Sequence, residues 1–128
     1  MPATRIETRA GWLDGRQGEL LEAVHRALVE GIRIPDDDRD IRLHELPASA
    51  MLTRPGRGER FTVIEISMFS GRSVEAKRRL HAALARELGA LGVPPADVKV
   101  LIHETPRENW SVGGVALSDV ELGFKVEV

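Results

Sequence analysis

The second half of the chain changes its hydrophobic period twice. The run FTVIEISM (61–68) is rich in β-branched residues and has the length of a buried strand. From Ser73 the apolar positions follow steps of three and four residues, which predicts a helix that ends at LGVPP (91–95). The segment VKVLIH (98–103) then alternates apolar and polar side chains, as a half-buried strand does. This half is therefore predicted to form a strand–helix–strand unit.

The first half contains a second copy of the end of this unit. The segments IRIPDDDRDIRLHELP (32–47) and LGVPPADVKVLIHETP (91–106) align without a gap. The shared residues are Pro35, Asp38, His44, Glu45 and Pro47 in the first copy, and Pro94, Asp97, His103, Glu104 and Pro106 in the second. Two copies of a unit of this length indicate a duplicated supersecondary motif.

A helix and a strand are also predicted ahead of the first copy. The helix follows from a stripe of apolar positions at Leu21, Val24, Leu28 and Ile32. The strand is expected near residues 3–8. The interval of the repeat places Pro2 opposite Phe61.

The two copies predict one α/β (α+β) domain over residues 1–128. Its βαβ units cover about 2–47 and 61–106, an exposed Pro-, Gly- and Arg-rich connection joins them, and a C-terminal hairpin or strand follows at about 109–128. Right-handed crossovers would give a four-stranded mixed sheet with both helices on one face. The other face needs cover, so self-association is expected.

Composition narrows the function classes. The chain has 128 residues, of which 42% are hydrophobic, enough to bury one core. The net charge of −2 argues against a general nucleic-acid binder, and the absence of cysteine excludes disulfides and thiolate chemistry. We expect a cytoplasmic protein with no membrane partner, because no apolar run is long enough for a span or a signal peptide. No histidine pair has a third donor at ligand spacing and no glycine-rich phosphate loop occurs, so no metal or cofactor is expected.

Two residues are candidates for chemistry. Once Met1 is removed, Pro2 would present a secondary amine, which is a compact base or nucleophile; the alternative is an ordinary proline near a chain start. Arg72 directly precedes the helix-capping Ser73, where the helix N-terminus favours an anion, so it is a candidate to bind a substrate carboxylate. The alternative for Arg72 is a surface arginine.

The protonation state of the Pro2 amine stays open at this level. Burial and nearby cations disfavour the charged form of an amine, which would leave a base, whereas a protonated amine would act as a general acid. The candidate cations are Arg5, Arg39, Arg72 and Lys99.

Several motifs carry a family resemblance. GRSVEAKRRL (71–80), VPPADVKVLIHE (93–104) and NWSVGG (109–114) resemble 4-oxalocrotonate tautomerase. LLEAVHRALVEGIRIPDDDR (20–39) is similar to malonate semialdehyde decarboxylases, in register from Pro2. The chain thus resembles the fused, two-unit branch of the tautomerase superfamily over nearly its whole length. The resemblance implies a tautomerase/MIF-like fold and a homotrimer, because fusion of two units halves the chain count of a six-unit assembly.

The resemblance also implies roles for individual residues. Pro2 would be the catalytic acid or base and Arg72 would bind substrate. Asp38 would position or activate water, although an acidic turn residue is an equally good interpretation. Trp110 would form an aromatic wall of the active site or pack at a subunit boundary. The further candidates for substrate contact are Phe69, Ser70 and Arg39, and His25 is retained because a dehalogenase relative uses a histidine in this region, although a partly buried helical histidine is the plainer interpretation.

The expected reaction is keto–enol tautomerisation of a small oxo acid such as phenylpyruvate. The related decarboxylases carry R-x-R at the turn before the second helix, whereas this chain has Ser70 in place of the first arginine. One carboxylate clamp is therefore missing, and decarboxylation or hydration of the malonate semialdehyde type is the alternative. A third hypothesis is a non-catalytic trimeric binding protein.

Overall fold

The computed structural model describes all residues from 1 to 128. Its main elements are β1 (Ala3–Arg9), α1 (Gln17–Ile32), β2 (Ile41–Leu46), β3 (Thr62–Phe69), α2 (Val74–Ala90) and β4 (Val98–Thr105). Two short strands follow, β5 (Ser111–Val112) and β6 (Val115–Ala116). Single turns of 3₁₀ helix lie between several of these elements.

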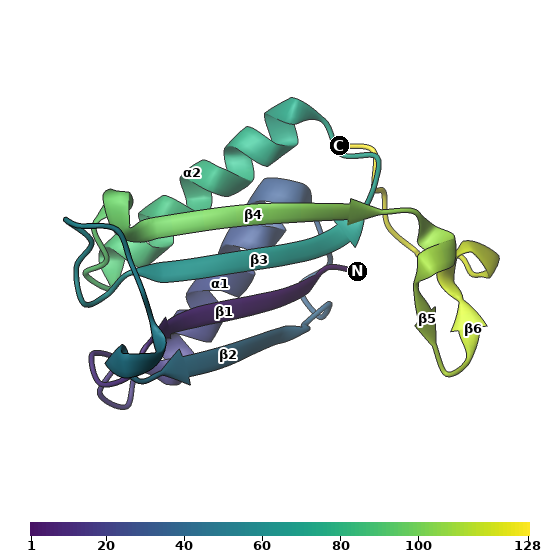
Figure 1. Ribbon diagram of the computed structural model, residues 1–128. Helices are drawn as coiled ribbons and strands as arrows, with labels where there is room; N and C mark the ends of the chain where they lie inside the picture. The colour runs from purple at the N-terminus through teal and green to yellow at the C-terminus, as the bar shows by residue number, and fades with distance from the viewer.

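The four long strands form one mixed sheet in the order β2-β1-β3-β4. β1 pairs with β2 and β3 with β4 in parallel, whereas the two units meet through an antiparallel pairing of β1 with β3. Figure 1 shows both helices on one face of this sheet. The predicted fold class is confirmed, including the tandem βαβ repeat.

The core lies between the helices and the sheet. Alternate residues of β3, namely Ile64, Ile66 and Met68, are fully buried, as period-two alternation requires when one face meets the core. The two helices cross closely at Gly31, where an added Cβ would lie 2.6 Å from the Cα of Leu80. Neither helix has the length and apolar composition needed to cross a membrane.

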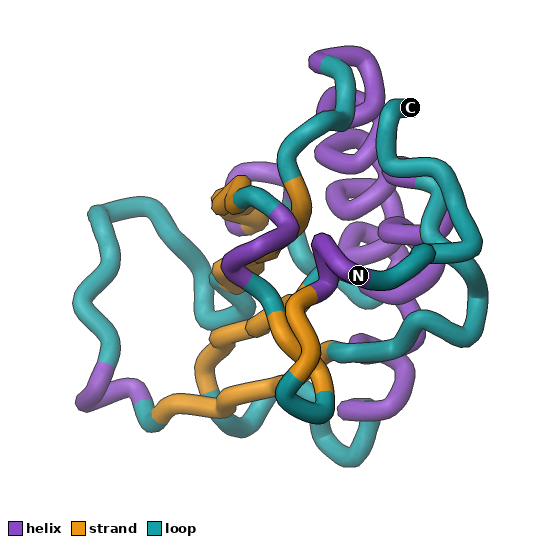
Figure 2. The backbone as a smooth tube through the Cα atoms, turned by 90° about the vertical axis from the view of Figure 1, so that its right-hand side faces the viewer, coloured by secondary structure: helices purple, strands orange, loops and turns teal.

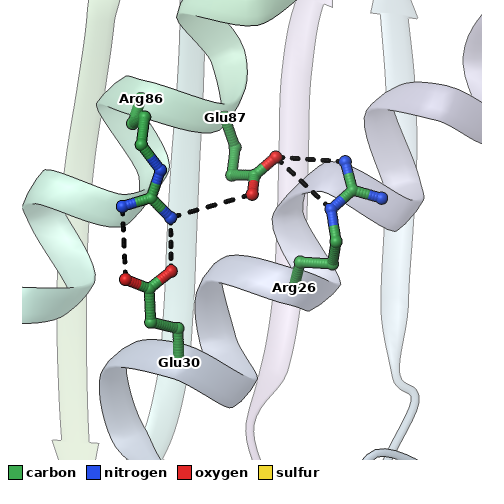
Figure 3. Close-up of polar contacts among 4 residues, drawn as sticks. All are labelled: Arg26, Glu30, Arg86 and Glu87. Atoms are coloured by element: carbon green, nitrogen blue, oxygen red, sulfur yellow. Dashed lines mark hydrogen bonds and ion pairs between the residues drawn. The ribbon is translucent and has the colours of Figure 1, made fainter.

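A charged network bridges the outer faces of the two helices. The Arg26 guanidinium lies 3.0 Å from the Glu87 carboxylate, and Arg86 contacts both Glu30 and Glu87 (Figure 3). Both arginine side chains are more than half exposed, so solvent screens these pairs and each contributes little to stability.

The structure corrects the sequence alignment of the two units by one residue in their first parts. Leu20, Val24 and Leu28 of α1 are buried and match the buried Leu80, Leu84 and Leu88 of α2, whereas the predicted stripe residue Leu21 is only half-buried. The strand registers agree: Glu7 of β1 lies opposite His44 and Ser67 of β3 lies opposite His103, so Glu7 matches Ser67 and the first strands are offset by one residue from the repeat that the last strands follow. Pro2 consequently matches Thr62, not Phe61.

The C-terminal part of the chain folds back towards the start of β1. β5 and β6 form the predicted hairpin around two glycines with positive φ, Gly113 and Gly114. The segment 124–128 forms no strand, but Val126 is buried against Phe69. In Figure 1 the C-terminus lies beside the start of α2.

The connection between the units, residues 47–60, is exposed as predicted. In Figure 2 it loops out on the side of the sheet away from the helices. Leu52 within it is fully exposed. The connection joins the end of β2 to the start of β3, at the opposite end of the sheet from the N-terminus (Figure 1).

Candidate active site

Four chain segments meet at one end of the sheet. Because β1 and β3 are antiparallel, the start of β1 lies beside the end of β3, with Ala3 opposite Ser67. The end of α1 and the start of α2 lie at the same end (Figure 1). The loop before β2 is tied to β1 by the Thr4 N–H, which donates to the Asp40 carbonyl at 3.0 Å. This end of the sheet therefore brings the N-terminus, Asp38 and Arg72 together.

The N-terminal amine faces Asp38. The Met1 nitrogen lies 3.6 Å from Asp38 Oδ2, and the following residue, Pro2, is buried. Asp38 is held in a turn in which its N–H donates to the Pro35 carbonyl at 3.1 Å. Its Oδ2 is buried and accepts no hydrogen bond, and its carboxylate acts electrostatically on both the amine and Arg72.

The pKa of this amine is lowered from its ordinary value. Burial is the largest cause, and the positive charges of Arg72 and Arg107 act in the same direction. The Asp38 carboxylate opposes them, because a nearby negative charge favours the protonated amine. The site therefore increases the fraction of neutral amine near neutral pH.

Arg72 is a buried cation with free donors. It is 5% exposed, and its Nε donates to the Ile32 carbonyl at 3.3 Å, while neither Nη atom has a partner. Burial also lowers the pKa of the guanidinium, with Asp38 opposing this shift. Unpaired buried donors are costly, so such an arrangement is typical of a place where a ligand supplies the missing acceptor. A carboxylate is the acceptor that matches a guanidinium.

The local sequence places Arg72 here. Gly71 adopts a φ of 131°, which L side chains rarely adopt, and this turns the chain from the end of β3 into α2. Ser73 then caps α2 by accepting the Ala76 N–H at 3.0 Å, and its hydroxyl donates to the Val128 carbonyl at 2.7 Å. The capping interaction predicted from the sequence is confirmed.

An aromatic pair borders the same end of the sheet. The rings of Phe69 and Trp110 pack edge to face with centroids 5.2 Å apart. The Trp110 indole N–H donates to the Thr105 hydroxyl at 2.6 Å, which fixes the ring. The Met1 side chain packs against the same cluster.

Ser70 lies in an adjoining hollow of about 430 Å³. Arg107 lines this hollow as well, together with residues of the C-terminal segment. The Ser70 N–H donates to the Thr105 carbonyl at 3.1 Å, which continues the pairing of β3 with β4 by one residue. No group of three metal-ligating side chains is present here or elsewhere in the protein.

Two of the candidate residues lie elsewhere. Arg39 forms an ion pair with Glu22, and both line a separate hollow of about 340 Å³ between α1 and β2. His25 also borders that hollow, and its ring contacts the Asp36 carbonyl. Among the other expected cations, Arg5 pairs with Glu65 at 2.8 Å. Of the four expected cations, Arg72 acts on the N-terminal amine, and the second cation that acts on it is Arg107 in place of Arg5, Arg39 or Lys99.

The amino-acid sequence of this chain matches the model of a known protein family. A family model described as "Tautomerase enzyme" matches residues 38–113, which is more than half of the chain. The chain belongs to the tautomerase family. The matched range includes Asp38, Arg72 and Trp110.

Curated relatives of this chain agree with that family. A 2-hydroxymuconate tautomerase of Comamonas testosteroni is 40% identical over 57 residues, which cover 44% of this chain and 90% of that protein. The probable tautomerase YusQ of Bacillus subtilis is 25% identical over 119 residues, which cover 88% of this chain and 94% of that protein. One relative thus matches the length of a single unit, and the other matches nearly the whole chain.

Solved structures with the same fold extend the comparison. The fused 4-OT R7, described as an asymmetric trimer, has a TM-score of 0.80 at 26% identity over 91% of this chain and 96% of its own. The malonate semialdehyde decarboxylase FG41, inhibited by 3-bromopropiolate, has a TM-score of 0.77 at 29% identity, and the match covers 91% of this chain and 92% of that protein. Pt0534, inactivated by 2-oxo-3-pentynoate, has a TM-score of 0.84 at 25% identity, and the match covers 93% of this chain and 99% of that protein.

Arg107 was not among the site residues predicted from the sequence. Its guanidinium lies 5.9 Å from the centre of the Phe69 ring and donates to the carbonyls of Leu117 and Val120 at 2.8 and 2.7 Å. The sequence did contain an indication of its role, because Arg107 stands just before the NWSVGG motif (109–114) that resembles the family. Its proximity to the amine, however, depends on how the chain returns after β4.

The opposite end of the sheet carries no equivalent site. Thr62 occupies the position of Pro2, and Trp12 follows β1 where Arg72 follows β3. The Trp12 indole N–H donates to the Thr8 hydroxyl at 2.9 Å, and the Thr8 and Thr62 hydroxyls are 2.9 Å apart. Asp97, the counterpart of Asp38, accepts the Gly58 N–H at 3.1 Å. These contacts fill the second end with paired polar groups.

Proposed function

We propose that the Pro2 amine, exposed by removal of Met1, is the acid–base group of a keto–enol tautomerase for small oxo carboxylic acids. The observation that carries the proposal is the pair of unpartnered Nη atoms on buried Arg72 beside the N-terminus. A substrate carboxylate supplies the acceptors that these donors lack. Membership of the tautomerase family supports the same class of reaction.

The proposed chemistry needs three groups. Arg72 holds the carboxylate of a 2-oxo acid, which orients the acidic carbon next to the carbonyl towards the amine. The neutral amine removes a proton from that carbon, and the carbonyl oxygen gains a proton from water to form the enol. The protonated amine then gives its proton to solvent, so no net proton is gained or lost. Burial and the charges of Arg72 and Arg107 favour the neutral amine, as described for the N-terminal amine of Met1. Asp38 opposes them and holds the amine in place.

The substrate side chain is proposed to be apolar and aromatic. The fully buried Phe69 and the half-buried Trp110 form an edge-to-face aromatic pair next to the N-terminus, with the Met1 side chain packed against this cluster. Removal of Met1 vacates that volume beside the two rings. A phenylpyruvate-type oxo acid fits this environment, since its ring can pack where the methionine side chain lies.

Decarboxylation or hydration of the malonate semialdehyde type is the second candidate. It is favoured by Asp38, whose buried Oδ2 has no hydrogen-bond donor and faces the amine. It is disfavoured by Ser70, which leaves Arg72 as the arginine at this turn. Arg107 lines the hollow next to Ser70 and offers a replacement positive charge.

We further propose that the two units and the C-terminal segment act as one domain in a homotrimer. The sheet face opposite the helices is uncovered and carries Leu101, which is 48% exposed. The hairpin exposes Val112 and Val115. A structural relative, the fused 4-OT R7, is described as a trimer. Light scattering that gives a stable monomer at micromolar concentration would contradict this part of the proposal.

Two measurements test the enzymatic proposal. Intact mass should show loss of Met1, because a retained methionine blocks the secondary amine. Phenylpyruvate enolisation should fall about 10²- to 10⁴-fold in Pro2→Ala, as expected for loss of a positioned acid–base group. Thr62→Ala, at the matching position of the second unit, serves as the control and should retain activity. If Pro2→Ala keeps wild-type rates on phenylpyruvate and malonate semialdehyde, the Pro2 mechanism is refuted. If Met1 is retained and the wild-type protein turns over neither substrate, the non-catalytic trimeric binding protein becomes the better explanation.

Covalent labelling provides an independent test. An alkynyl 2-oxo acid such as 2-oxo-3-pentynoate is an electrophile that a neutral amine can attack at the alkyne. Incubation should add one equivalent of its mass to the N-terminal peptide. Arg72→Met should slow this labelling because the carboxylate is no longer held. Labelling spread over lysines instead would contradict a reactive N-terminal amine.

A further inference from the structure

His25 is a buried histidine with one hydrogen bond. It lies on α1 and is 2% exposed. Its Nε2 is 2.7 Å from the backbone oxygen of Asp36. A carbonyl oxygen can only accept, so Nε2 carries the proton and donates. Nδ1 is also buried and has no partner. The single donated bond therefore gives the ring its one polar contact with the protein backbone.

That bond holds the loop that carries Asp38. The loop leaves α1 through Arg33, whose φ is 59°, and buries Ile34. Beyond Asp36 the chain turns, and the Asp38 N–H closes the turn on the Pro35 carbonyl. The Asp36 carbonyl is thus fixed by His25 inside the same turn that directs Asp38 towards the amine.

The loop has few other anchors. The Asp36 side chain is 90% exposed, and Asp37 is not buried. The next tie to the sheet is the bond from the Thr4 N–H to the Asp40 carbonyl. Between Ile34 and Asp40, two side-chain contacts tie this loop to α1: the buried His25 ring bonds the Asp36 carbonyl, and Arg39 pairs with Glu22 through side chains that are half exposed. Solvent screens the exposed pair, so the bond to His25 is the buried tie between this turn and the helix layer.

We propose that His25 is a positioning residue, which acts through the Asp36 backbone to hold the Asp38 carboxylate against the N-terminal amine. This inference rests on the proposed function, in which Asp38 holds that amine. A shift of about 1 Å in a positioned group can cost about 10²-fold in rate. Loss of this bond is therefore expected to lower activity, although His25 itself does not contact the substrate. The competing explanation is that His25 only fills space in the core.

Substitutions separate the two explanations. His25→Leu removes the donor at similar volume, whereas His25→Gln keeps an N–H that can reach the Asp36 carbonyl. Positioning predicts that kcat/KM on phenylpyruvate falls about 10- to 100-fold in His25→Leu and stays within a few-fold in His25→Gln. Leu20→Ala, a core truncation elsewhere on α1, is the control for a purely structural loss. His25→Met replaces His25→Leu if circular dichroism shows that the leucine variant is unfolded.

A double-mutant cycle tests the route of the effect. If His25 acts through Asp38, His25→Leu causes no further loss beyond a few-fold when Asp38→Asn is already present. Equal losses in both backgrounds would overturn the inference. Loss in His25→Gln as large as in His25→Leu would overturn it as well, because the donor would then be irrelevant.

A titration of the N-terminal amine keeps this test separate from the proposed reaction. In the processed chain, the amine pKa is measured by NMR of the ¹⁵N-labelled N-terminus. The Asp38 carboxylate raises the pKa of the Met1 amine and is expected to act on the Pro2 amine in the same direction. Its displacement in His25→Leu should therefore lower the Pro2 amine pKa in the direction of Asp38→Asn, whereas Leu20→Ala should not. An unchanged pKa in His25→Leu would overturn the inference. Wild-type activity in Pro2→Ala would instead refute the proposed function and leave the titration result standing.

Discussion

Gly31 of α1 and Leu80 of α2 cross so closely that a Cβ on Gly31 would lie 2.6 Å from the Leu80 Cα. The atom in the way is backbone, so the contact cannot be relieved by a side-chain rotation. The spacing of the two helices above the sheet is therefore set at this crossing. Because Ile32, the next residue, gives its carbonyl to Arg72, the crossing also sets the position of the site.

Gly31→Ala should consequently destabilise the fold. The expected loss is about 1–3 kcal/mol in the free energy of unfolding, the usual cost of overpacking a core. Gly89→Ala is the matched control, since an added Cβ there meets nothing within 4 Å and alanine favours the helix. Urea denaturation of both variants checks the prediction, and equal midpoints would contradict it.

Arg72→Met should separate stability from function. The substitution removes a buried cation whose Nη donors are unpaired, so stability should not fall and is expected to rise by up to about 2 kcal/mol. Substrate capture should weaken, with KM rising about 10- to 100-fold for loss of charged hydrogen bonds. Thermal unfolding and steady-state kinetics test both parts, with exposed Arg78→Met as the control. A variant that is both destabilised and fully active would refute this assignment.

The pH dependence should respond to Asp38 in a defined direction. A catalytic base must be neutral, so the rate should rise with pH through the pKa of the N-terminal amine. Asp38 raises the pKa of the Met1 amine, and the Pro2 amine exposed by removal of Met1 is expected to respond in the same direction, so Asp38→Asn should move the rising limb to lower pH. Arg107 lowers the pKa, so Arg107→Gln should move the limb to higher pH. A pH–rate profile of kcat/KM measures both shifts; shifts in the same direction would be inconsistent with the site.

Trp110 should contribute to selectivity for aromatic substrates. Loss of its ring in Trp110→Ala removes one side of the aromatic pair, so KM for phenylpyruvate should rise about 3- to 10-fold, in line with the energy of such pairs. KM for pyruvate, which has no ring, should change much less. Trp12→Phe, at the opposite end of the sheet, should leave both values unchanged. Equal effects of Trp110→Ala on the two substrates would assign the ring a packing role.

The sequence predicted the sheet and helices well because their signals are local. Each strand or helix buries one face, and the spacing of the buried residues is visible within a short stretch of sequence, as at Ile64, Ile66 and Met68. The predicted alignment of the two helices was wrong by one residue. Leu20 and Leu21 are both apolar, so periodicity alone does not show which of them corresponds to the buried leucine of the second helix.

The site was harder to predict because its parts meet through long-range contacts. Pro2, Asp38, Arg72 and Trp110 were chosen with the help of family motifs, and the structure gathers them at one end of the sheet. Arg39 was chosen the same way, but its charge is directed to Glu22. Arg107 reaches the amine through the fold of the C-terminal segment, which carries no periodic signal.

The filled end of the sheet has a chemical consequence for the duplicated chain. The nitrogen of Thr62 corresponds to that of Pro2 but is an amide bonded to Phe61, and an amide neither gains nor loses a proton near neutral pH. Joining the units into one polypeptide therefore removed amine chemistry from the second unit at the moment of fusion, whatever side chains it kept. Trp12 and the threonine hydroxyls were then free to become core, so that one half of the molecule serves as scaffold for the other.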